Sequence, residues 1–366
     1  TGHDSGFKEL SLPTESSSDL QELVEICQPA SCGKGDKDVI DPKYRQAGKL
    51  DAGCFLTTFQ PEHFGIIESI EETLLPAVTS TTDDGLQFRK IRAELYKLNV
   101  YSGPSGHFHK HVNTPRSDTK TGSLVVCLPS QFKGGNLIIR HNKQETNYDW
   151  SPRGDSTIQW AAFYSDCEHE MNTVTECNRI TLAYNLHVTK MTRPEIELYK
   201  TIVDPETFPS HEKIRQHLAD PEFMTECGVI GFYCSHAYPQ TTNELPPPVL
   251  KGIDHRIYAI FESLGMNIGI HPILECVPED LHLAGGVRVG LNHQTYRTTD
   301  RGGEDDCPED DIWPSRFVRG ITWITEPKHE QMAFSHVVYG NEASIGTRYS
   351  SVAILVIIPP HSQRGL

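Results

Sequence analysis

The sequence lacks both long apolar runs and an excess of positive charge. No stretch of about 18 or more apolar residues occurs among its 366 residues, which excludes a membrane-spanning helix. Its 33 Lys and Arg residues are outnumbered by 49 Asp and Glu residues, giving a formal net charge of −16, and the basic residues are scattered. Nucleic acid is bound through clustered basic side chains, and the sequence contains no such cluster. We therefore expect a protein that binds neither membranes nor nucleic acid.

Closely spaced cysteines and an N-terminal targeting signal are also missing. Ten cysteines are spread along the chain without a CxxC pair, a distribution typical of reduced thiols rather than of a disulfide framework. The first residues contain neither a basic segment nor an apolar stretch of the signal-peptide type. Both absences favour a cytoplasmic location.

Two helices are predicted near the N-terminus, after a polar, Ser-rich segment at residues 1–18 that we expect to be poorly ordered. Asp19 is a suitable N-cap for the sequence LQELVEIC that follows it. The segment PEHFGIIESIEETLLP, residues 61–76, has apolar residues at helical spacing and ends at Pro76.

From about residue 89 onward the hydrophobic period changes from helical spacing to two, which predicts strands. Turn residues separate the runs, and the pair Gly134 and Gly135 fits one tight turn. Five strands within about 100 residues, with no helical pattern between them, favour an antiparallel sandwich or barrel. The predicted strands are residues 94–101, 122–129, 135–141, 156–164 and 178–188.

The C-terminal part of the chain has a mixed pattern. Helices are predicted at residues 193–202 and 255–265, and a strand covered on both faces at 349–360. The acidic segment 301–311 is interrupted by Gly and Pro, so we expect a solvent-exposed loop. We divide the chain into a core at 19–190 and a mixed α/β region at 191–366 that packs on it, with a degenerate second β-helix as the alternative for that region.

Three histidines and an asparagine stand close together in the segment HFHKHVNTP. Side chains at positions i and i+2 of a strand share a face, so His107, His109 and His111 could align, and so could His111 and Asn113. Spacing alone does not choose between these sets. A further histidine, His169, follows 58 residues after His111, and Arg179 stands ten residues beyond it.

The motifs around these residues resemble the Fe(II)/2-oxoglutarate-dependent oxygenases, in particular their prolyl-4-hydroxylase-like branch. The resemblance covers about residues 90–190; the C-terminal half is similar only loosely to uncharacterised fungal-type relatives. It implies a mainly β protein with flanking helices, built on a double-stranded β-helix or jelly-roll core. The segments that carry it are LYKLNVYSGPSGHFHKHVNTPR, GSLVVCLPSQFKGGNLIIRH, IQWAAFYSDCEHEM and NRITLAYNL.

The resemblance implies a role for individual residues of this chain. His111 takes the place of the first metal-binding histidine and His169 that of the distal one. Arg179 matches the anchor for the far carboxylate of 2-oxoglutarate, and Thr181 the hydroxyl residue that assists it. Tyr101 occupies a position near 2-oxoglutarate in related enzymes, although a packed tyrosine is the alternative. Two imidazoles and one oxygen donor leave three positions on Fe(II), two for the 2-oxo acid and one for O₂.

Asn113 departs from the family motif, which has Asp at this position. The amide oxygen can coordinate a metal but is neutral, so we expect weaker Fe(II) binding. Three explanations compete: a natural ligand variant, a deliberate substitution that traps an inactive complex, and a chain that has lost catalysis. Asp118 is a poor substitute because it would face the opposite side of a continuing strand.

Further residues are candidates for contact with substrate, each with an alternative role in packing or solvation. They are His107, His109, Arg116, Trp160 and Tyr164.

The resulting prediction is a dioxygenase that uses Fe(II), 2-oxoglutarate and O₂ to oxidise a C–H bond by hydroxylation, desaturation or ring closure. A small molecule, such as an amino acid or a natural-product intermediate, is favoured as substrate. The alternatives are a prolyl or peptidyl hydroxylase acting on a protein and a catalytically silent 2-oxoglutarate-binding protein.

Overall fold

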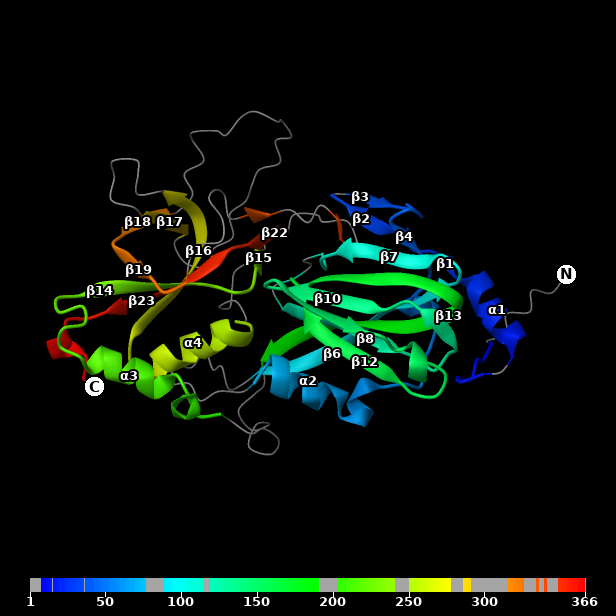
Figure 1. Cartoon of the computed structure of the whole chain (residues 1–366), viewed down its shortest axis with the longest axis horizontal. Helices are drawn as coiled ribbons and strands as arrows, with labels where there is room; N and C mark the ends of the chain where they lie inside the picture. The colour runs from blue at the N-terminus through cyan, green and yellow to red at the C-terminus, as the bar shows by residue number, and fades with distance from the viewer. Residues whose placement is uncertain are drawn as a thin grey trace, which may run out of the picture.

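The computed structural model divides into a barrel half and a C-terminal half that lie side by side, with the two termini at opposite ends (Figure 1). The predicted mainly β fold with a double-stranded β-helix core is confirmed. The predicted helix at 193–202, the acidic segment 301–311, Arg116 and Asp118 lie outside the described residues. The structure describes residues 8–14, 16–35, 37–76, 89–114, 117, 119–190, 203–240, 250–277, 286–290, 315–325, 334–335, 339–340 and 348–365.

Two antiparallel sheets form the barrel, and one long strand belongs to both. Up to Cys177 this strand, β13 (Glu168–Lys190), pairs with the smaller sheet, and from Asn178 onward it pairs with the larger one. The larger sheet has the order β1-β5-β6-β13-β8-β12, and the smaller one β4-β7-β13-β10-β11, with β9 also on β13. Their other strands are β1 (Gln28–Pro29), β4 (Arg45–Gln46), β5 (Gly48–Asp51), β6 (Arg89–Ser102), β7 (Gly106–His111), β8 (Lys120–Cys127), β9 (Phe132–Gly134), β10 (Leu137–His141), β11 (Gln144–Tyr148) and β12 (Gln159–Tyr164).

All five predicted strands are present, and four strands of the smaller sheet, β4, β7, β9 and β11, were not predicted as separate elements. The exposure of β11 explains why it was not predicted, because all five of its residues are exposed and show no apolar alternation. Gly134 and Gly135 have φ values of 71° and 67°, as a tight turn between β9 and β10 requires.

The helices at the N-terminus begin and end differently from the prediction. The N-cap of α1 (Ser17–Ile26) is Ser16, whose hydroxyl accepts from the backbone N–H of Asp19, so the assignment of Asp19 as cap was wrong. The predicted second helix is divided by Gly65, which has a φ of 68°, into a 3₁₀ turn at Pro61–Phe64 and α2 (Ile66–Leu74). The remaining short elements of this region are β2 (Cys32–Lys34), β3 (Lys37–Val39) and the 3₁₀ turn Ala52–Cys54.

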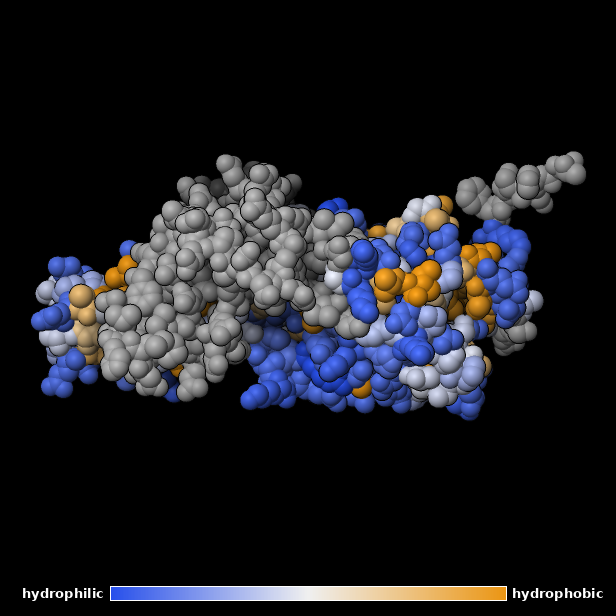
Figure 2. Space-filling view, turned by 90° about the horizontal axis from the view of Figure 1, so that it is seen from above, coloured by the Kyte–Doolittle hydropathy of each residue, from blue (hydrophilic) through white to orange (hydrophobic). Residues whose placement is uncertain are grey.

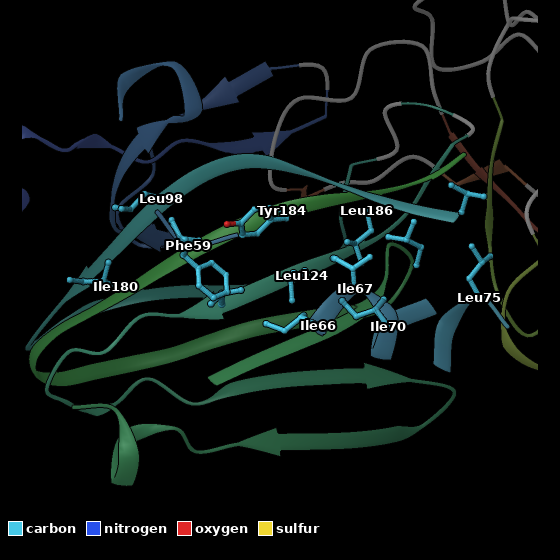
Figure 3. Close-up of a cluster of buried hydrophobic side chains, with 14 of the residues drawn as sticks. Phe59, Ile66, Ile67, Ile70, Leu75, Leu98, Leu124, Ile180, Tyr184 and Leu186 are labelled. Carbon is cyan, nitrogen blue, oxygen red and sulfur yellow. The ribbon is translucent and has the colours of Figure 1, made fainter. Parts of the chain in front are cut away.

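The main hydrophobic core lies between α2 and the outer face of the larger sheet (Figure 3). Ile66, Ile67 and Ile70 of α2 are at most 5% exposed and pack against sheet residues such as Leu124 and Leu186, which are fully buried. Because neighbouring residues of a strand point to opposite faces, the other face of the larger sheet is turned into the barrel. The helix therefore covers one face and leaves the other to line the interior cavity.

The C-terminal half contains a six-stranded sheet with the order β18-β17-β16-β23-β14-β19 and two helices, α3 and α4. Its central strand, β23 (Val352–Ile358), is buried except at Ile357, as predicted for a strand covered on both faces. The other elements are 3₁₀ Pro205–Thr207, α3 (His211–Ala219), β14 (Gly228–Tyr233), β15 (Tyr238–Gln240), α4 (Gly252–Ser263), β16 (Asn267–Val277), β17 (Gly286–Gly290), β18 (Ser315–Arg319), β19 (Ile321–Trp323), β20 (Phe334–Ser335), β21 (Tyr339–Gly340), β22 (Arg348–Ser350) and 3₁₀ His361–Gln363.

Among the described residues, no helix has the length and apolar character needed to cross a membrane. On the face shown in Figure 2, the barrel half is mainly hydrophilic, with separate small hydrophobic areas. Single exposed apolar side chains, such as Leu56 at 90% exposure, are normal on protein surfaces and do not indicate a docking site.

Candidate metal and 2-oxoglutarate site

A β-bulge in β7 separates His111 from the two histidines before it. Residues His169 and Met171 of β13 pair with His111 and Phe108 of β7. One residue of β13 therefore lies opposite two of β7, His109 and Lys110. The extra residue turns His111 to the buried face that Phe108 occupies, and the two rings stack with centroids 3.6 Å apart. The i, i+2 alignment of the three histidines that a regular strand would give is therefore absent.

His169 lies opposite His111 at the start of β13, and the two imidazole rings have centroids 4.2 Å apart. In each ring Nδ1 donates to a backbone carbonyl two residues earlier, that of His109 at 2.8 Å and that of Cys167 at 3.1 Å. A carbonyl can only accept, so these bonds fix the proton on Nδ1 and leave the Nε2 lone pair as the ligand atom. The pair is thus arranged as two neutral imidazole ligands.

Burial keeps both imidazoles neutral. It lowers the pKa of His169 from 6.5 to about 4, and burial, together with neighbouring His169, holds the pKa of His111 well below its usual range. Protons therefore do not compete with a metal ion for the Nε2 atoms near neutral pH.

The metal-free protein should lose stability in mild acid because of His169. The unfolded chain takes up a proton below pH 6.5, whereas folded His169 does so only near pH 4, so stability is complete above 6.5 and falls as the pH approaches 4. Between about pH 7.5 and pH 5 this group alone should cost about 2 kcal/mol of unfolding free energy. Urea denaturation at the two pH values measures it. Replacing His169 by Leu should make the drop in unfolding free energy between the two pH values smaller by this amount. An equal drop in the variant would contradict the attribution of the loss to His169.

Asn113 is the second residue after the end of β7 and is 3% exposed. Its Nδ2 donates to the hydroxyl of Ser123, on the inner face of β8, at 3.0 Å. Because the amide nitrogen is engaged there, Oδ1 is the atom left for a metal ion. Ser123 thus orients the neutral amide of this candidate ligand in the cavity that the two imidazoles line, and no sequence motif singles this serine out.

A cavity opens inside the barrel at this cluster and encloses about 670 Å³, including the part open to solvent. It is lined by the three candidate ligands, by Tyr101 and Thr181, and by polar side chains of β4, β6 and β13: Arg45, Lys97, Asn99, Glu170 and Asn185.

Arg179 lies on β13, opposite Tyr101 of β6, and does not line the cavity. It is fully buried, on the same side of β13 as Thr181, with its guanidinium 4.9 Å from the ring centroid of Trp150. Its Nη1 donates to the carbonyl of Gly135 and to the sulfur of Met171, whereas Nε and Nη2 have no partner among the described atoms. A buried guanidinium with unmade hydrogen bonds fits the carboxylate of a bound 2-oxo acid.

The turn at Gly135 makes room for this arginine. A Cβ atom at that residue would lie 2.7 Å from Cγ2 of Val174 and 3.4 Å from Cδ of Arg179, in addition to requiring the strained φ of 67°. Only glycine permits this approach.

The structure does not bring the four described candidate substrate residues to the cavity. His107 and His109 lie on the outer side of β7, where their rings are 4.7 Å apart and His107 is bonded to the carbonyls of Ser105 and Lys43. Trp160 is 36% exposed on β12. Tyr164 is buried between the halves, donates to the carbonyl of Leu74 and accepts from the N–H of Gly252. Neither aromatic residue lines the cavity.

A second group with metal-ligating side chains consists of His141, Asp166 and His236, whose ligand atoms lie within 4.8 Å of one another. The ammonium of Lys251 is 2.7 Å from Oδ1 of Asp166, and Nδ1 of His236 is 3.0 Å from Oδ2. Both carboxylate oxygens are therefore already paired, and a cation occupies the place of a metal ion. This cluster is an ion-pair network.

Comparison with known proteins supports the class that this geometry indicates. The sequence model of the 2OG-Fe(II) oxygenase superfamily matches residues 96–187, the segment that contains most of the barrel strands from β6 to β13, the candidate ligands and Arg179. This superfamily implies Fe(II), 2-oxoglutarate and O₂ as cofactors, and it indicates an oxidoreductase. The donor set fits such a group, with a neutral amide in place of one carboxylate.

Among curated proteins no match is found. Solved structures with a similar barrel include a Pseudomonas putida prolyl-4-hydroxylase, at 14% identity over 47% of this chain and 83% of that one, with a TM-score of 0.30. A 2OG-Fe(II) oxygenase family oxidoreductase from Burkholderia pseudomallei gives 15% identity over 46% and 78%, with a TM-score of 0.28. A Trichoplax adhaerens prolyl hydroxylase, solved with a peptide fragment, gives 13% over 46% and 75%, with a TM-score of 0.28. Likeness at these identities and scores supports no conclusion about activity or substrate.

Proposed function

We propose that the chain is a Fe(II)- and 2-oxoglutarate-dependent oxygenase of the prolyl-4-hydroxylase-like branch. In this proposal His111, Asn113 and His169 hold the metal, and Arg179 holds the far carboxylate of 2-oxoglutarate with help from Thr181. The observation that carries it is that one barrel holds two imidazoles with free Nε2 atoms, an oriented amide oxygen and a buried guanidinium with two nitrogens that have no partner among the described atoms. When bound, Fe(II), 2-oxoglutarate and O₂ supply the oxidising power that removes hydrogen from a C–H bond.

The chain's own residues bind and orient. The planar guanidinium of Arg179 can take two carboxylate oxygens at once, which fixes 2-oxoglutarate lengthwise in the barrel. Tyr101, which is 4% exposed and lines the cavity, borders this path. Because product depends on how the substrate is held, hydroxylation, desaturation and ring closure are all open to this site.

We further propose a small substrate that carries a carboxylate, such as an amino acid or a natural-product intermediate of fungal metabolism. The support is Arg45, a cavity-lining residue that is 4% exposed. Both of its hydrogen-bond acceptors are neutral, the carbonyl of Ser31 and Oδ1 of Asn99, each at 2.8 Å. Burying a cation is costly unless a negative charge joins it, and an anionic substrate would supply that charge.

A cytoplasmic location agrees with the eight described cysteines, which are all free thiols.

A substrate screen tests this part of the proposal. With Fe(II) and 2-oxoglutarate present, succinate release should rise when small carboxylates such as amino acids are added, and much less with their amides or with peptides. Replacing Arg45 by Met should abolish the stimulation and leave the basal release. Stimulation by proline-containing peptides instead would favour the peptidyl hydroxylase alternative. A chain that binds 2-oxoglutarate but releases no succinate with any addition would support the catalytically silent one.

A further inference from the structure

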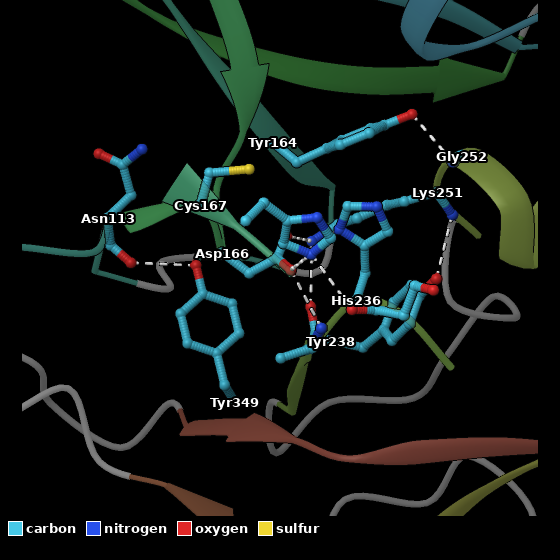
Figure 4. Close-up of polar contacts among 12 residues, drawn as sticks. Asn113, Tyr164, Asp166, Cys167, His236, Tyr238, Lys251, Gly252 and Tyr349 are labelled. Carbon is cyan, nitrogen blue, oxygen red and sulfur yellow. Dashed lines mark hydrogen bonds and ion pairs between the residues drawn. The ribbon is translucent and has the colours of Figure 1, made fainter. Parts of the chain in front are cut away.

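The C-terminal half contacts the barrel at both chain segments that carry candidate metal ligands. The first is the segment after β7. There Val112 forms a parallel bridge with Gly340, and the hydroxyl of Tyr349 donates to the carbonyl of Asn113 at 3.0 Å (Figure 4). Tyr349 is 4% exposed, and burial holds the pKa of its phenol well above the usual value, so it stays a donor. The two contacts hold the backbone at Val112 and at Asn113, which fixes where the Asn113 side chain begins.

The second segment is the turn before His169. Its Asp166 receives three hydrogen bonds from the C-terminal half: Lys251 Nζ at 2.7 Å, His236 Nδ1 at 3.0 Å and the backbone N–H of Ala237 at 3.1 Å (Figure 4). The Lys251 ammonium and the His236 hydrogen bond hold the pKa of the Asp166 carboxyl far below its usual value despite burial. The next carbonyl along the chain, that of Cys167, orients the imidazole of His169.

The donors on the C-terminal side are themselves held in place. Asp254, at the start of α4, accepts from the backbone N–H groups of Ser235 and His236 and from the hydroxyl of Tyr238. A buried ion pair of this kind adds little net stability, because desolvation offsets its attraction, but it defines one geometry. A metal centre with a neutral amide ligand depends on such a geometry more than one with a carboxylate, since less charge draws its ligands together.

We propose that the C-terminal half positions the metal ligands of the barrel: Tyr349 fixes the Asn113 segment, and Asp166, held by Lys251 and His236, fixes the turn that orients His169. These are positioning residues, since none of them touches the metal. The inference rests on the proposed metal site and assigns the C-terminal half a part in it.

Tyr349→Phe, which removes one hydroxyl, tests the first contact. Anaerobic Co(II) titration should give an affinity roughly 10 to 100-fold below that of the unmodified chain, the usual cost of losing a partner that orients a ligand. The visible Co(II) spectrum, which reports ligand geometry, should change as well. Thr325→Val is the control, since it removes a hydroxyl of the C-terminal half that bonds to the backbone of Tyr233 and to neither ligand segment, and it should leave affinity and spectrum unchanged.

Lys251→Met and Lys251→Arg test the second contact. The methionine variant should bind Co(II) more weakly, and the arginine variant, which keeps a cation beside Asp166, should restore most of the affinity. Equal affinities and spectra for the unmodified chain, Tyr349→Phe and Lys251→Met would overturn the inference while leaving the metal site intact. Failure of the unmodified chain to bind Co(II) would instead overturn the proposed metal site, and this inference with it.

Discussion

Replacing Arg179 by Met should abolish 2-oxoglutarate binding and leave the ligand-free protein at least as stable as before. The guanidinium is fully buried, and within the described part of the chain its Nη1 donates to an uncharged carbonyl and a sulfur atom. Nε and Nη2 have no partner in the described structure, so they cost free energy until a ligand arrives. Methionine has a similar length and no polar hydrogens, and buried charged groups can often be replaced by apolar ones without loss.

The expected loss of affinity follows from the two unmade bonds. Hydrogen bonds to a charged group contribute about 1.5–3 kcal/mol each, so two of them correspond to roughly two to four orders of magnitude in the dissociation constant. Calorimetric titration of 2-oxoglutarate with Mn(II) present measures this, and thermal unfolding of the apo-protein measures the stability. The matched control is Arg45→Met, which removes another buried guanidinium of the barrel and should keep 2-oxoglutarate affinity. An Arg179→Met variant that binds 2-oxoglutarate normally would remove Arg179 from this role.

Asn113→Asp should tighten metal binding and raise succinate release. A carboxylate brings a negative charge to the metal ion that the amide lacks, and the gain should be at least the roughly 10 to 100-fold typical of smaller perturbations near a metal. The neighbouring Ser123 hydroxyl accepts from the amide now and can donate to a carboxylate instead, so the side chain can keep its orientation. Without metal, the new buried carboxylate should lower the stability of the folded state.

The control for this substitution is Asn185→Asp, which adds the same charge to the same cavity at a residue outside the ligand set. Metal affinity measured by calorimetry should rise strongly in Asn113→Asp and little in Asn185→Asp. Equal effects would mean that the charge acts through the general field of the cavity and that Asn113 is not a ligand. If only Asn113→Asp releases succinate, the chain as it stands is catalytically silent.

Periodicity predicted the architecture because the strands of the larger sheet alternate clearly. In β6, Leu98 and Val100 face the core under α2, whereas Lys97, Asn99 and Tyr101 line the cavity. The apolar alternation predicts the strand, but nothing in it indicates that the opposite face encloses a binding site. The binding cavity arises only when the two sheets close around that face of the strand.

The local details of the site were less accessible for physical reasons. Three histidines at alternate positions do not reveal the bulge at His109 and Lys110 that turns only His111 inward, because a bulge depends on pairing with another strand. Asn113 and Tyr349 are separated by 236 positions in the chain, and no sequence pattern links a tyrosine to a distant carbonyl. The motif could identify the candidate ligands; it could not identify what orients them.

The most direct test of the proposed site is an anaerobic titration with Fe(II) followed by 2-oxoglutarate, monitored by visible absorption. A 2-oxo acid that chelates Fe(II) gives a visible charge-transfer band. The band is absent when the protein binds Fe(II) and the 2-oxo acid at separate places. We predict this band for the unmodified chain with one equivalent of each component, and its loss in His169→Ala, which removes one of the two imidazoles. A chain that binds both components without the band, or a His169→Ala variant that keeps it, would contradict the proposed site.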